Sequence, residues 1–335
     1  MKAFILDAYK KKGALRFGDA PEPEPELRYD DVLVEIHAAG LNPLDAKIRD
    51  GAFKMILPYR PPFILGHEMA GTIVRVGSNV RSFKAGDQVY ARPRDGRIGT
   101  FAPLIAVNQA DLALKPANLS MEEAASIPLV GLTAWQALVE QAGLKQGQKV
   151  LIHAGSGGVG TFAIQLAKHL GATVATTTST ANVALVERLG ADIVIDYKKE
   201  DFEASLSGYD VVLNSLDSDT LRKSLNVLRP GGKLISISGP PDPAFAREQG
   251  SNWLLRQVFR FLSRGIRSGA RRRGVDYAFL FMRANGQQLG RIAALIEDGS
   301  IRPVIDKVFP FDALNQAMTH LETGRAKGKV VVALR

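Results

Sequence analysis

The sequence predicts an α/β protein with a doubly wound parallel sheet and a separate β-rich domain. Three observations lead to this fold class. A glycine-rich turn joins an apolar run to a helical pattern near residue 155, strand and helix patterns alternate from there to about residue 240, and short strands between turn residues fill the first 120 or so residues. Alternating strands and helices form parallel sheets covered by helices, whereas short strands between turns form antiparallel ones.

The amino-terminal part has the pattern of a compact antiparallel domain. Short runs that alternate apolar and polar residues, at 32–36, 71–77 and 88–91, lie between Gly, Pro, Asn and Asp residues. The sequence Ser120–Glu123 predicts a capping box that opens a helix leading into the next domain. We therefore place the first domain boundary after residue 122.

The glycine-rich turn is the most informative segment. The apolar run 150–152, the turn and the helical pattern 161–168 follow one another directly, which is typical of a dinucleotide-binding βα unit. Gly155 would allow the turn, Gly157 would let the backbone approach a pyrophosphate, and Gly160 would let the helix pack on the strand. The helix N-terminus would face the phosphates. The alternative is a glycine-rich turn without a ligand.

The following residues continue the alternation and then return to β structure. Strand patterns at 172–178, 193–195, 211–214 and 233–238, with helices at 183–189 and 219–228, complete the parallel sheet. A helix at 288–297 and strands at 303–306 and 329–333 resemble the first part of the chain in texture. We predict a nucleotide-binding domain, 123–279, inserted in a β-rich domain made of 1–122 and 280–335.

The residues about 20 positions beyond the glycines favour NADP(H) over NAD(H). A carboxylate there usually binds the ribose 2′-hydroxyl, but this chain has Thr178, Ser179, Thr180 and Asn182. Hydroxyl and amide groups can donate hydrogen bonds to a 2′-phosphate, whereas a carboxylate would repel it. In the alternative interpretation these residues only cap the next helix.

Composition excludes several classes of function. The 335 residues, 46% of them hydrophobic, are enough for two domains with sizeable cores. The absence of cysteine excludes disulfides, iron–sulfur clusters, thiolate nucleophiles and cysteine-rich zinc sites. No run approaches the roughly 20 apolar residues of a membrane helix and the first residues enter a strand pattern, so we expect a cytoplasmic protein.

Positive charge is concentrated in one segment. The net charge is +9, and residues 253–273 hold seven arginines and no acidic residue. The four-residue spacing of Arg256, Arg260 and Arg264 predicts a helical stripe opposite Leu255, Phe259 and Leu262. The segment is either a solvated helix face or a contact with a membrane surface or acidic partner. No nucleic-acid-binding motif accompanies it.

Motifs along nearly the whole chain resemble the medium-chain dehydrogenase/reductase superfamily. The resemblance is to its zinc-independent, NADPH-dependent quinone oxidoreductases and enone reductases. Tyr277–Met282 and Ile301–Asp306 are most similar to the branch of the reticulon-4-interacting protein and the chloroplast-envelope oxidoreductase. The resemblance implies a GroES-like catalytic domain, a Rossmann domain and a homodimer. The motifs are Ala38–Pro43, Gly66–Gly71, Phe83–Val89, Gly131–Trp135, Gly155–Gly160 and Arg325–Val330.

The same resemblance raises the question of zinc. Zinc-dependent relatives hold the metal with a cysteine, a histidine and a third side chain. His67 and Glu68 keep part of that motif, but Asn42 stands at the place of the first ligand and the four-cysteine structural loop has no counterpart. We predict no metal site and interpret His67 as a hydrogen-bonded structural histidine.

The resemblance also implies catalytic residues. It places Asn42 beside the nicotinamide and substrate, Tyr59 in the loop over the cleft and Thr133 on the inner helix near the carboxamide. Asn42 and Tyr59 would orient the developing enolate or donate to it, with solvent as the final proton source. Their alternatives are structural: a turn for Asn42, a loop cover for Tyr59 and helix packing for Thr133. Asp45 and Lys47 are interpreted as solvated turn charges.

Cofactor contacts follow from the resemblance in the same way. Ordinary core packing is the alternative for the two phenylalanines, and a strand-edge position is the alternative for the lysine. The expected contacts are Ser156, Gly157, Gly158 and Val159 at the pyrophosphate, Ser179 and Asn182 at the 2′-phosphate, Tyr197 at the adenosine, Asn214, Ser238 and Gly239 at the strand ends, Phe279 and Phe281 at the nicotinamide, and Lys329 at a phosphate.

Without a Lewis acid, the simplest reaction for such a protein is hydride delivery to a carbon that is already electrophilic, in a quinone or an α,β-unsaturated carbonyl compound. The negative charge then moves to a distant oxygen, which needs only hydrogen-bond donors and a proton. Two alternatives stay open. One is an NADP-binding protein with a sensor or interaction role. The other, a zinc-dependent alcohol dehydrogenase, is disfavoured by the ligands.

Overall fold

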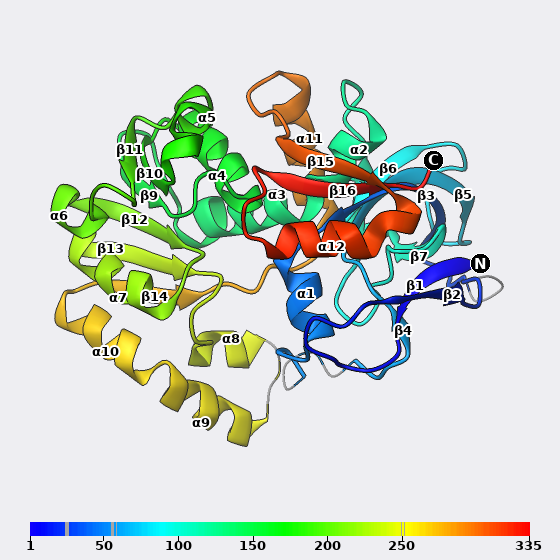
Figure 1. Ribbon diagram of the computed structural model, residues 1–335, viewed down its shortest axis with the longest axis horizontal. Coiled ribbons are helices and arrows are strands. Elements are labelled where there is room, and N and C mark those ends of the chain that lie inside the picture. Colours follow the sequence, from blue (N-terminus) through cyan, green and yellow to red (C-terminus); the bar gives the residue numbers. More distant parts are fainter. Residues whose placement is uncertain (24–26, 55–56, 58, 249, 251) are drawn as a thin grey trace. The chain divides into compact units, whose positions relative to one another are not determined.

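The computed structural model describes residues 1–23, 27–54, 57, 59–248, 250 and 252–335. The chain divides into two units (Figure 1). Met1–Leu132 and Arg283–Arg335 form the β-rich unit, and Thr133–Met282 forms the parallel-sheet unit. The first boundary lies after Leu132 rather than after residue 122, because helix α2 (Met121–Ala125) packs on strands of the β-rich unit. The second lies after Met282 rather than after residue 279.

The parallel-sheet unit confirms the predicted doubly wound fold. Its six strands lie in the order β11-β10-β9-β12-β13-β14, and every neighbouring pair is parallel. The carboxyl ends of all six strands therefore lie at one edge, where open α/β sheets bind ligands. The strands are β9 (Lys149–Ile152), β10 (Thr173–Thr178), β11 (Ile193–Asp196), β12 (Tyr209–Asn214), β13 (Leu228–Ser236) and β14 (Asp276–Phe279).

Helices cover the parallel sheet (Figure 1). Helix α4 packs on β9 and β10, while α7 packs on β12 and β13. One core layer joins Leu151 and Leu234 of the sheet to Leu225 of α7 and Ile266 of α10. The helices are α3 (Pro128–Trp135), which crosses the boundary, η2 (Gln136–Gln141), α4 (Gly158–His169), η3 (Thr180–Asn182), α5 (Val183–Arg188), α6 (Phe202–Ser205), α7 (Ser218–Val227), α8 (Pro243–Glu248), α9 (Trp253–Leu262) and α10 (Arg264–Arg272).

The β-rich unit is built on a mainly antiparallel sheet in the order β15-β16-β3-β5-β6-β8, with β7 also paired to β3. Strand β16, near the end of the chain, pairs with β3 and so brings the two sequence segments of this unit together. The strands are β3 (Asp31–Leu41), β5 (Glu68–Val76), β6 (Gln88–Ala91), β7 (Leu104–Asn108), β8 (Leu112–Leu114), β15 (Ile305–Pro310) and β16 (Lys329–Ala333); β1 (Lys2–Leu6), β2 (Arg16–Asp19) and β4 (Phe63–Ile64) form a small second sheet.

Short helices fill the remainder of the β-rich unit. The capping box predicted at Ser120 is confirmed: Ser120 Oγ accepts from the Glu123 N–H, and the Glu123 carboxylate accepts from the Ser120 N–H. The strand predicted at 303–306 begins later, at Ile305, because Pro303 has no N–H for the ladder. The helices are α1 (Pro43–Arg49), α2, η1 (Gln109–Asp111), α11 (Gly286–Glu297), η4 (Phe311–Ala313) and α12 (Leu314–Glu322).

None of the helices in the described part of the chain combines the length and the apolar character that crossing a bilayer requires.

Candidate functional site

The turn between β9 and α4 needs two of its glycines for packing. A Cβ on Gly155 would lie 2.1 Å from Thr176 Oγ1, and one on Gly160 would lie 2.3 Å from the Ala154 carbonyl oxygen. The sequence analysis assigned Gly155 to the turn itself, but Ala154 is the residue with a left-handed φ, +53°. Gly155 is instead required by its close approach to β10.

Gly157 differs from its two neighbours. A Cβ on Gly157 would meet only the Ala154 carbonyl oxygen, at 3.3 Å. Gly157 is also the N-cap of α4, and no side chain caps that helix. Space beside Gly157 and an uncapped helix N-terminus are the two features that a pyrophosphate group needs. These residues fit a dinucleotide.

Polar side chains gather at the ends of β9 and β10. Ser156 Oγ accepts hydrogen bonds from Thr178 Oγ1 and Asn182 Nδ2, both at 3.1 Å. Asn182 Nδ2 is also 3.3 Å from Ser179 Oγ, while Asn182 Oδ1 is buried without a partner among the described residues. The structure thus brings together Ser156, Ser179 and Asn182, the residues predicted for the phosphates.

A carboxylate does lie near this cluster, but on the next strand. Thr180 Oγ1 donates to Asp196 Oδ2 at 2.6 Å, and this hydrogen bond lowers the pKa of Asp196. Lys199 Nζ lies 3.4 Å from the same carboxylate. The side chain of Tyr197, which follows β11, is 62% exposed. Asp196 therefore stays ionised, with Thr180 and Lys199 as its partners, and sequence spacing alone did not reveal it.

The ends of β12 and β13 hold a second polar cluster. Asn214 Oδ1 accepts from Ser236 Oγ at 3.1 Å and Ser238 Oγ at 3.3 Å, and the Gly239 N–H donates to Ser236 Oγ at 2.9 Å. Asn214 Nδ2 is buried and has no partner among the described residues. An unmatched buried donor costs about 1–3 kcal/mol, so an acceptor group of a ligand fits this position.

The two phenylalanines predicted at the nicotinamide lie in an aromatic cluster. The ring centroids of Phe279 and Phe281 are 5.1 and 5.9 Å from that of Phe245 in α8. The Phe279 N–H donates to Asp242 Oδ2 at 3.2 Å. Their side chains therefore contribute to packing. Backbone contact with the nicotinamide stays a prediction.

Lys329 does not lie where the sequence analysis placed it. Its ammonium group donates to the Leu41 carbonyl at 2.9 Å and to Asn42 Oδ1 and Glu68 Oε1, both at 2.6 Å. An ammonium has three hydrogens, so none is left for a phosphate. The cause is the register of β16 on β3, which pairs Val330 with Leu41 and holds Lys329 inside the β-rich unit, 4% exposed.

The side chains around Lys329 form a buried network. Glu68 Oε1 also accepts from Asn42 Nδ2 at 2.7 Å, and Glu68 Oε2 accepts from the Leu129 N–H at 2.7 Å. The Glu68 carboxylate is thus balanced in charge and bonded at both oxygens. Asn42, only 1% exposed, is held at both ends of its amide and keeps one Nδ2 hydrogen to donate.

A histidine–aspartate pair adjoins this network. His67 Nδ1 lies 2.6 Å from Asp45 Oδ1, and Asp45 Oδ2 accepts from the Asn42 N–H at 2.7 Å. Both side chains are fully buried, and His67 Nε2 has no partner in the part of the chain that is described. The interpretation of Asp45 as a solvated charge is therefore wrong, because α1 begins at Pro43 and turns Asp45 inward; Lys47 is exposed as expected.

These donors do not fit a zinc ion. Glu68 and Asn42 are bonded to the Lys329 ammonium, a cation already present, and Asp45 is bonded to His67. Within the described ranges no three His, Asp or Glu side chains are placed to hold a metal. Only His67 Nε2 is available, whereas a zinc site takes four ligands.

Tyr59 and Thr133 lie in different settings. The Tyr59 ring packs on Phe63 with centroids 5.2 Å apart, and its hydroxyl accepts from the Gly96 N–H at 3.2 Å. Burial raises the pKa of Tyr59 to about 12, so the hydroxyl stays protonated at neutral pH and can donate a hydrogen bond. Thr133 lies in α3 and is 4% exposed. Residues 55, 56 and 58 of the loop predicted around Tyr59, together with residues 249 and 251, are outside the described residues.

Two family descriptions match the chain. Residues 28–117 match the alcohol dehydrogenase GroES-like domain, and residues 189–332 match the zinc-binding dehydrogenase family. The first match covers most of the main sheet of the β-rich unit, and the second covers the later part of the parallel sheet together with the carboxyl-terminal strands.

Curated proteins and a solved structure are similar over the whole chain. A mitochondrial NAD(P)H oxidoreductase of Danio rerio, RTN4IP1, is 35% identical, with 100% of this chain and 91% of that protein aligned. The chloroplastic NADPH-dependent alkenal/one oxidoreductase of Arabidopsis thaliana is 36% identical over 99% of this chain and 79% of its own length. The quinone oxidoreductase structure from Coxiella burnetii gives a TM-score of 0.87 at 32% identity, covering 100% of this chain and 99% of that one.

Proposed function

Because this chain belongs to the NAD(P)H quinone and enone oxidoreductases of the medium-chain dehydrogenase/reductase superfamily, we propose that it transfers a hydride from NADPH to a quinone or an α,β-unsaturated carbonyl compound. Two sites carry the proposal. One unit has a complete dinucleotide turn between β9 and α4. In the other unit, the Lys329 ammonium is bonded to Asn42 and Glu68, at the place where a metal-dependent relative would need metal ligands.

Zinc independence is part of this proposal. A carbonyl that is not conjugated needs strong polarisation before it accepts a hydride, which a metal supplies. A conjugated acceptor needs less polarisation, because the electron pair displaced by the incoming hydride moves to an oxygen away from the attacked carbon. The bonding of Asn42 and Glu68 to Lys329 supports the second kind of substrate.

The residues at the sheet edge would hold the cofactor, whose nicotinamide supplies the hydride when bound. The space at Gly157 accommodates the pyrophosphate next to the N-terminus of α4. Ser179 would donate to the 2′-phosphate, a group that a carboxylate at that position would repel, and Asn182, whose amide donates to Ser156 and Ser179, would hold these hydroxyl groups in place. Asn214 Nδ2, a buried donor without a partner among the described residues, would donate to an acceptor of the dinucleotide.

Two donors would stabilise the oxygen on which negative charge collects. Tyr59 keeps its proton because its pKa is raised to about 12, so it donates a hydrogen bond. Asn42 contributes the Nδ2 hydrogen that Glu68 leaves free, and its amide is fixed by Lys329. Thr133 would position the carboxamide, and solvent delivers the proton that completes the reduction.

A cytoplasmic location and a homodimer complete the proposal. Strand β14 ends the parallel sheet and pairs with β13 on one side. An edge strand offers unpaired backbone groups to a second chain, which supports a dimer. Light scattering of the purified protein measures its oligomeric state directly.

A protein that binds NADP(H) without turnover is the second candidate. It is favoured by one observation: Asn42, the residue expected beside the substrate, is 1% exposed and bonded to both Glu68 and Lys329.

The test is oxidation of NADPH and of NADH by the purified protein, with one quinone and one short-chain enone, in the presence and absence of a metal chelator. We expect turnover that prefers NADPH and is insensitive to the chelator. Loss of activity with the chelator would overturn the metal-free reaction. Tight NADPH binding without turnover on either acceptor would favour the second candidate.

A further inference from the structure

Helix α9 is packed on one side and apolar on its exposed side. Phe259 is 4% exposed, with its ring centroid 6.0 Å from that of Phe245. On the exposed side, the relative accessibilities of Trp253, Leu254 and Phe261 are 73%, 65% and 75%. Leu262, predicted on the packed face, is 54% exposed because α9 ends there and α10 starts at Arg264.

The exposed residues of α9 occupy two parts of the helix surface. Leu254, Val258 and Phe261 follow one another at spacings of four and three residues and so share one face of the helix. Arg256 and Arg260 are also four residues apart and lie roughly 150° around the helix from that face, although Arg260 and Phe261 line the same hollow. Large apolar side chains beside arginines on an exposed helix are typical of helices that lie in the interface of a membrane.

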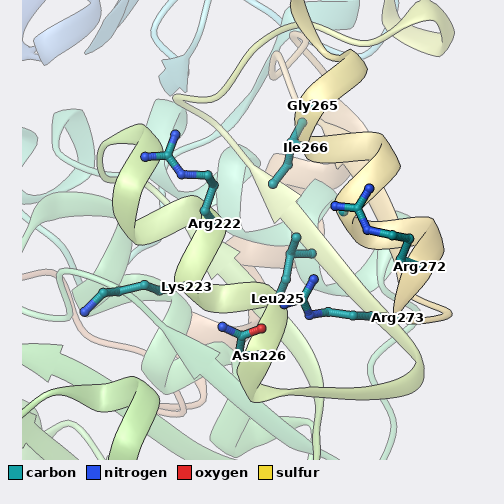
Figure 2. Close-up of a pocket in the computed structure, with 9 residues that line it drawn as sticks. Arg222, Lys223, Leu225, Asn226, Gly265, Ile266, Arg272 and Arg273 are labelled. Atoms are coloured by element: carbon teal, nitrogen blue, oxygen red, sulfur yellow. The ribbon is translucent and has the colours of Figure 1, made fainter.

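Helix α10 carries two basic hollows, one on each side. The first is lined by Gln257, Arg260, Phe261, Arg264, Arg267 and Arg271. The second, shown in Figure 2, includes Arg222, Lys223, Asn226, Arg272 and Arg273. Helices α9 and α10 follow one another along the margin of the parallel-sheet unit (Figure 1), so the first hollow continues the apolar face of α9.

The two hollows differ in how their charges are balanced. In the second, Arg222 is paired with Asp219 and Lys223 with Asp201, whereas no ion pair joins Arg272 or Arg273 to a carboxylate within the described residues. In the first, no ion pair joins Arg260, Arg264, Arg267 or Arg271 to a carboxylate within the described residues. Four guanidinium groups without an internal counter-charge attract anions from outside, and guanidinium binds phosphate through two parallel hydrogen bonds.

We propose that α9 and the adjoining first hollow dock this protein on the surface of an anionic lipid bilayer. Trp253, Leu254 and Phe261 enter the boundary between headgroups and acyl chains, while the arginines of the hollow bind lipid phosphates. Nucleic acid or an acidic protein would satisfy the arginines but would give the exposed apolar side chains no partner, which favours the bilayer. The proposal concerns a surface apart from the cofactor residues and holds whether or not the protein turns over substrate.

The first test is flotation of the NADPH-loaded protein with vesicles of phosphatidylcholine alone or mixed with phosphatidylglycerol. We expect binding only to the mixed vesicles, and weaker binding as the salt concentration rises, because salt screens the arginines. Absence of binding to the mixed vesicles at low salt would overturn the proposal. Equal binding to both vesicles would overturn its electrostatic part.

Matched variants locate the surface. The triple variant Arg264→Gln, Arg267→Gln, Arg271→Gln should weaken binding to mixed vesicles by roughly a hundredfold, at about fivefold for each arginine near an anionic surface. The control variant Lys10→Gln, Lys11→Gln, Lys84→Gln removes the same charge from exposed positions of the β-rich unit and should change binding little. An equal loss in both variants would show attraction by net charge alone and overturn the site.

Trp253 reports insertion. The chain has two tryptophans, so Trp135→Phe leaves Trp253 as the fluorophore. Mixed vesicles that contain brominated lipid should quench its fluorescence, and Leu254→Ser with Phe261→Ser should abolish the quenching. Binding without quenching would overturn insertion. If the Leu254→Ser, Phe261→Ser variant instead converts a dimer to a monomer, a second copy covers α9 and the proposal is wrong. NADPH binding by each variant verifies that it is folded.

Discussion

The nucleotide turn of the parallel-sheet unit and the buried network of the β-rich unit use polar groups in opposite ways. Around the turn, the structure leaves Gly157 less crowded than Gly155 and Gly160, and it leaves both Asn182 Oδ1 and Asn214 Nδ2 without partners among the described residues. In the network, Lys329 and Glu68 are bonded at every hydrogen or oxygen that can be used. A region that must receive a ligand keeps unsatisfied groups, whereas a region that must hold its own shape keeps none.

His67 Nε2 is the exception inside the network. It is buried and has no partner in the described part of the chain, although Nδ1 is fixed by Asp45. The network therefore keeps two groups that can bind a ligand, His67 Nε2 and the remaining Nδ2 hydrogen of Asn42.

The largest effect is expected for the network. Lys329→Met leaves the Glu68 carboxylate buried without a cation, which should lower the free energy of unfolding by about 3–5 kcal/mol. Denaturant unfolding measures the loss. Lys327→Met, at an exposed position two residues earlier, is the control and should change stability little. Adding Glu68→Gln to Lys329→Met should restore part of the stability; if it does not, the lysine acts by packing rather than by charge.

A substitution at Gly157 in the turn should affect NADPH binding more than it affects the stability of the fold. Gly157→Val adds atoms beside the N-terminus of α4 and should weaken NADPH binding by roughly a hundredfold, or about 3 kcal/mol, with a smaller loss of melting temperature than Gly160→Val, because the Ala154 carbonyl oxygen would lie 3.3 Å from its Cβ rather than 2.3 Å. Gly160→Val is the matched contrast, because its Cβ would meet the Ala154 carbonyl and should destabilise the fold. Calorimetric titration and thermal unfolding separate the two. Unchanged affinity in a folded Gly157→Val protein would contradict the pyrophosphate site.

A second histidine, His153, extends the comparison of the two regions through the pH dependence of the free energy of unfolding. His153, directly before the turn, lies 3.2 Å from Thr177 Oγ1 through Nδ1 and 2.9 Å from Ser224 Oγ through Nε2. Burial lowers the pKa of His153 to about 4, below its usual value of 6.5. Its neutral form therefore contributes stability that is fully present above about pH 6.5 and is lost as the pH falls toward 4.

We expect the free energy of unfolding to fall by about 2 kcal/mol between pH 7 and pH 5 through this histidine. His153→Gln, which can keep hydrogen bonds and does not titrate, should show a smaller fall over the same interval. Parallel curves for the two proteins would mean that His153 does not titrate in the native state as its burial indicates.

The smallest effect is expected for cofactor choice. Ser179→Asp brings a carboxylate to the predicted 2′-phosphate position and should raise the KM for NADPH about tenfold, while leaving that for NADH nearly unchanged. Steady-state kinetics with both cofactors measure the ratio. Ser179→Asn is the control, since an amide still donates hydrogen bonds. An equal rise for both cofactors would place Ser179 away from the 2′-phosphate.

The two regions also differ in how far sequence could predict them. The turn is local: strand, glycines and helix lie within about twenty residues, so periodicity and glycine spacing sufficed for its fold. The network joins Lys329 to Asn42 across 287 positions, and only the pairing of β16 with β3 brings them together. No single-sequence pattern reports a long-range register, which explains why Lys329 was predicted at a phosphate and Asp45 in solvent.

A weaker signal for the network was present. Asn42 and Asp45 flank the start of a short helix, and His67 and Glu68 precede a strand that is largely buried. Polar residues at the ends of buried elements need partners, which is a reason to search for a distant cation. The exposed apolar face of α9 gave no such signal, because its residues have the spacing of an ordinary packed helix.

The distance in sequence between Lys329 and its partners affects how the chain is made. A ribosome completes every strand of the parallel sheet before it adds β16, so the dinucleotide unit can fold while Asn42 and Glu68 still have no cation. A carboxylate destined for burial must therefore stay hydrated until Lys329 has been added. Any stop shortly before codon 329 would release a polypeptide with a sound nucleotide unit and a β-rich unit unable to close, a form that quality-control proteases would recognise by its exposed β3 edge.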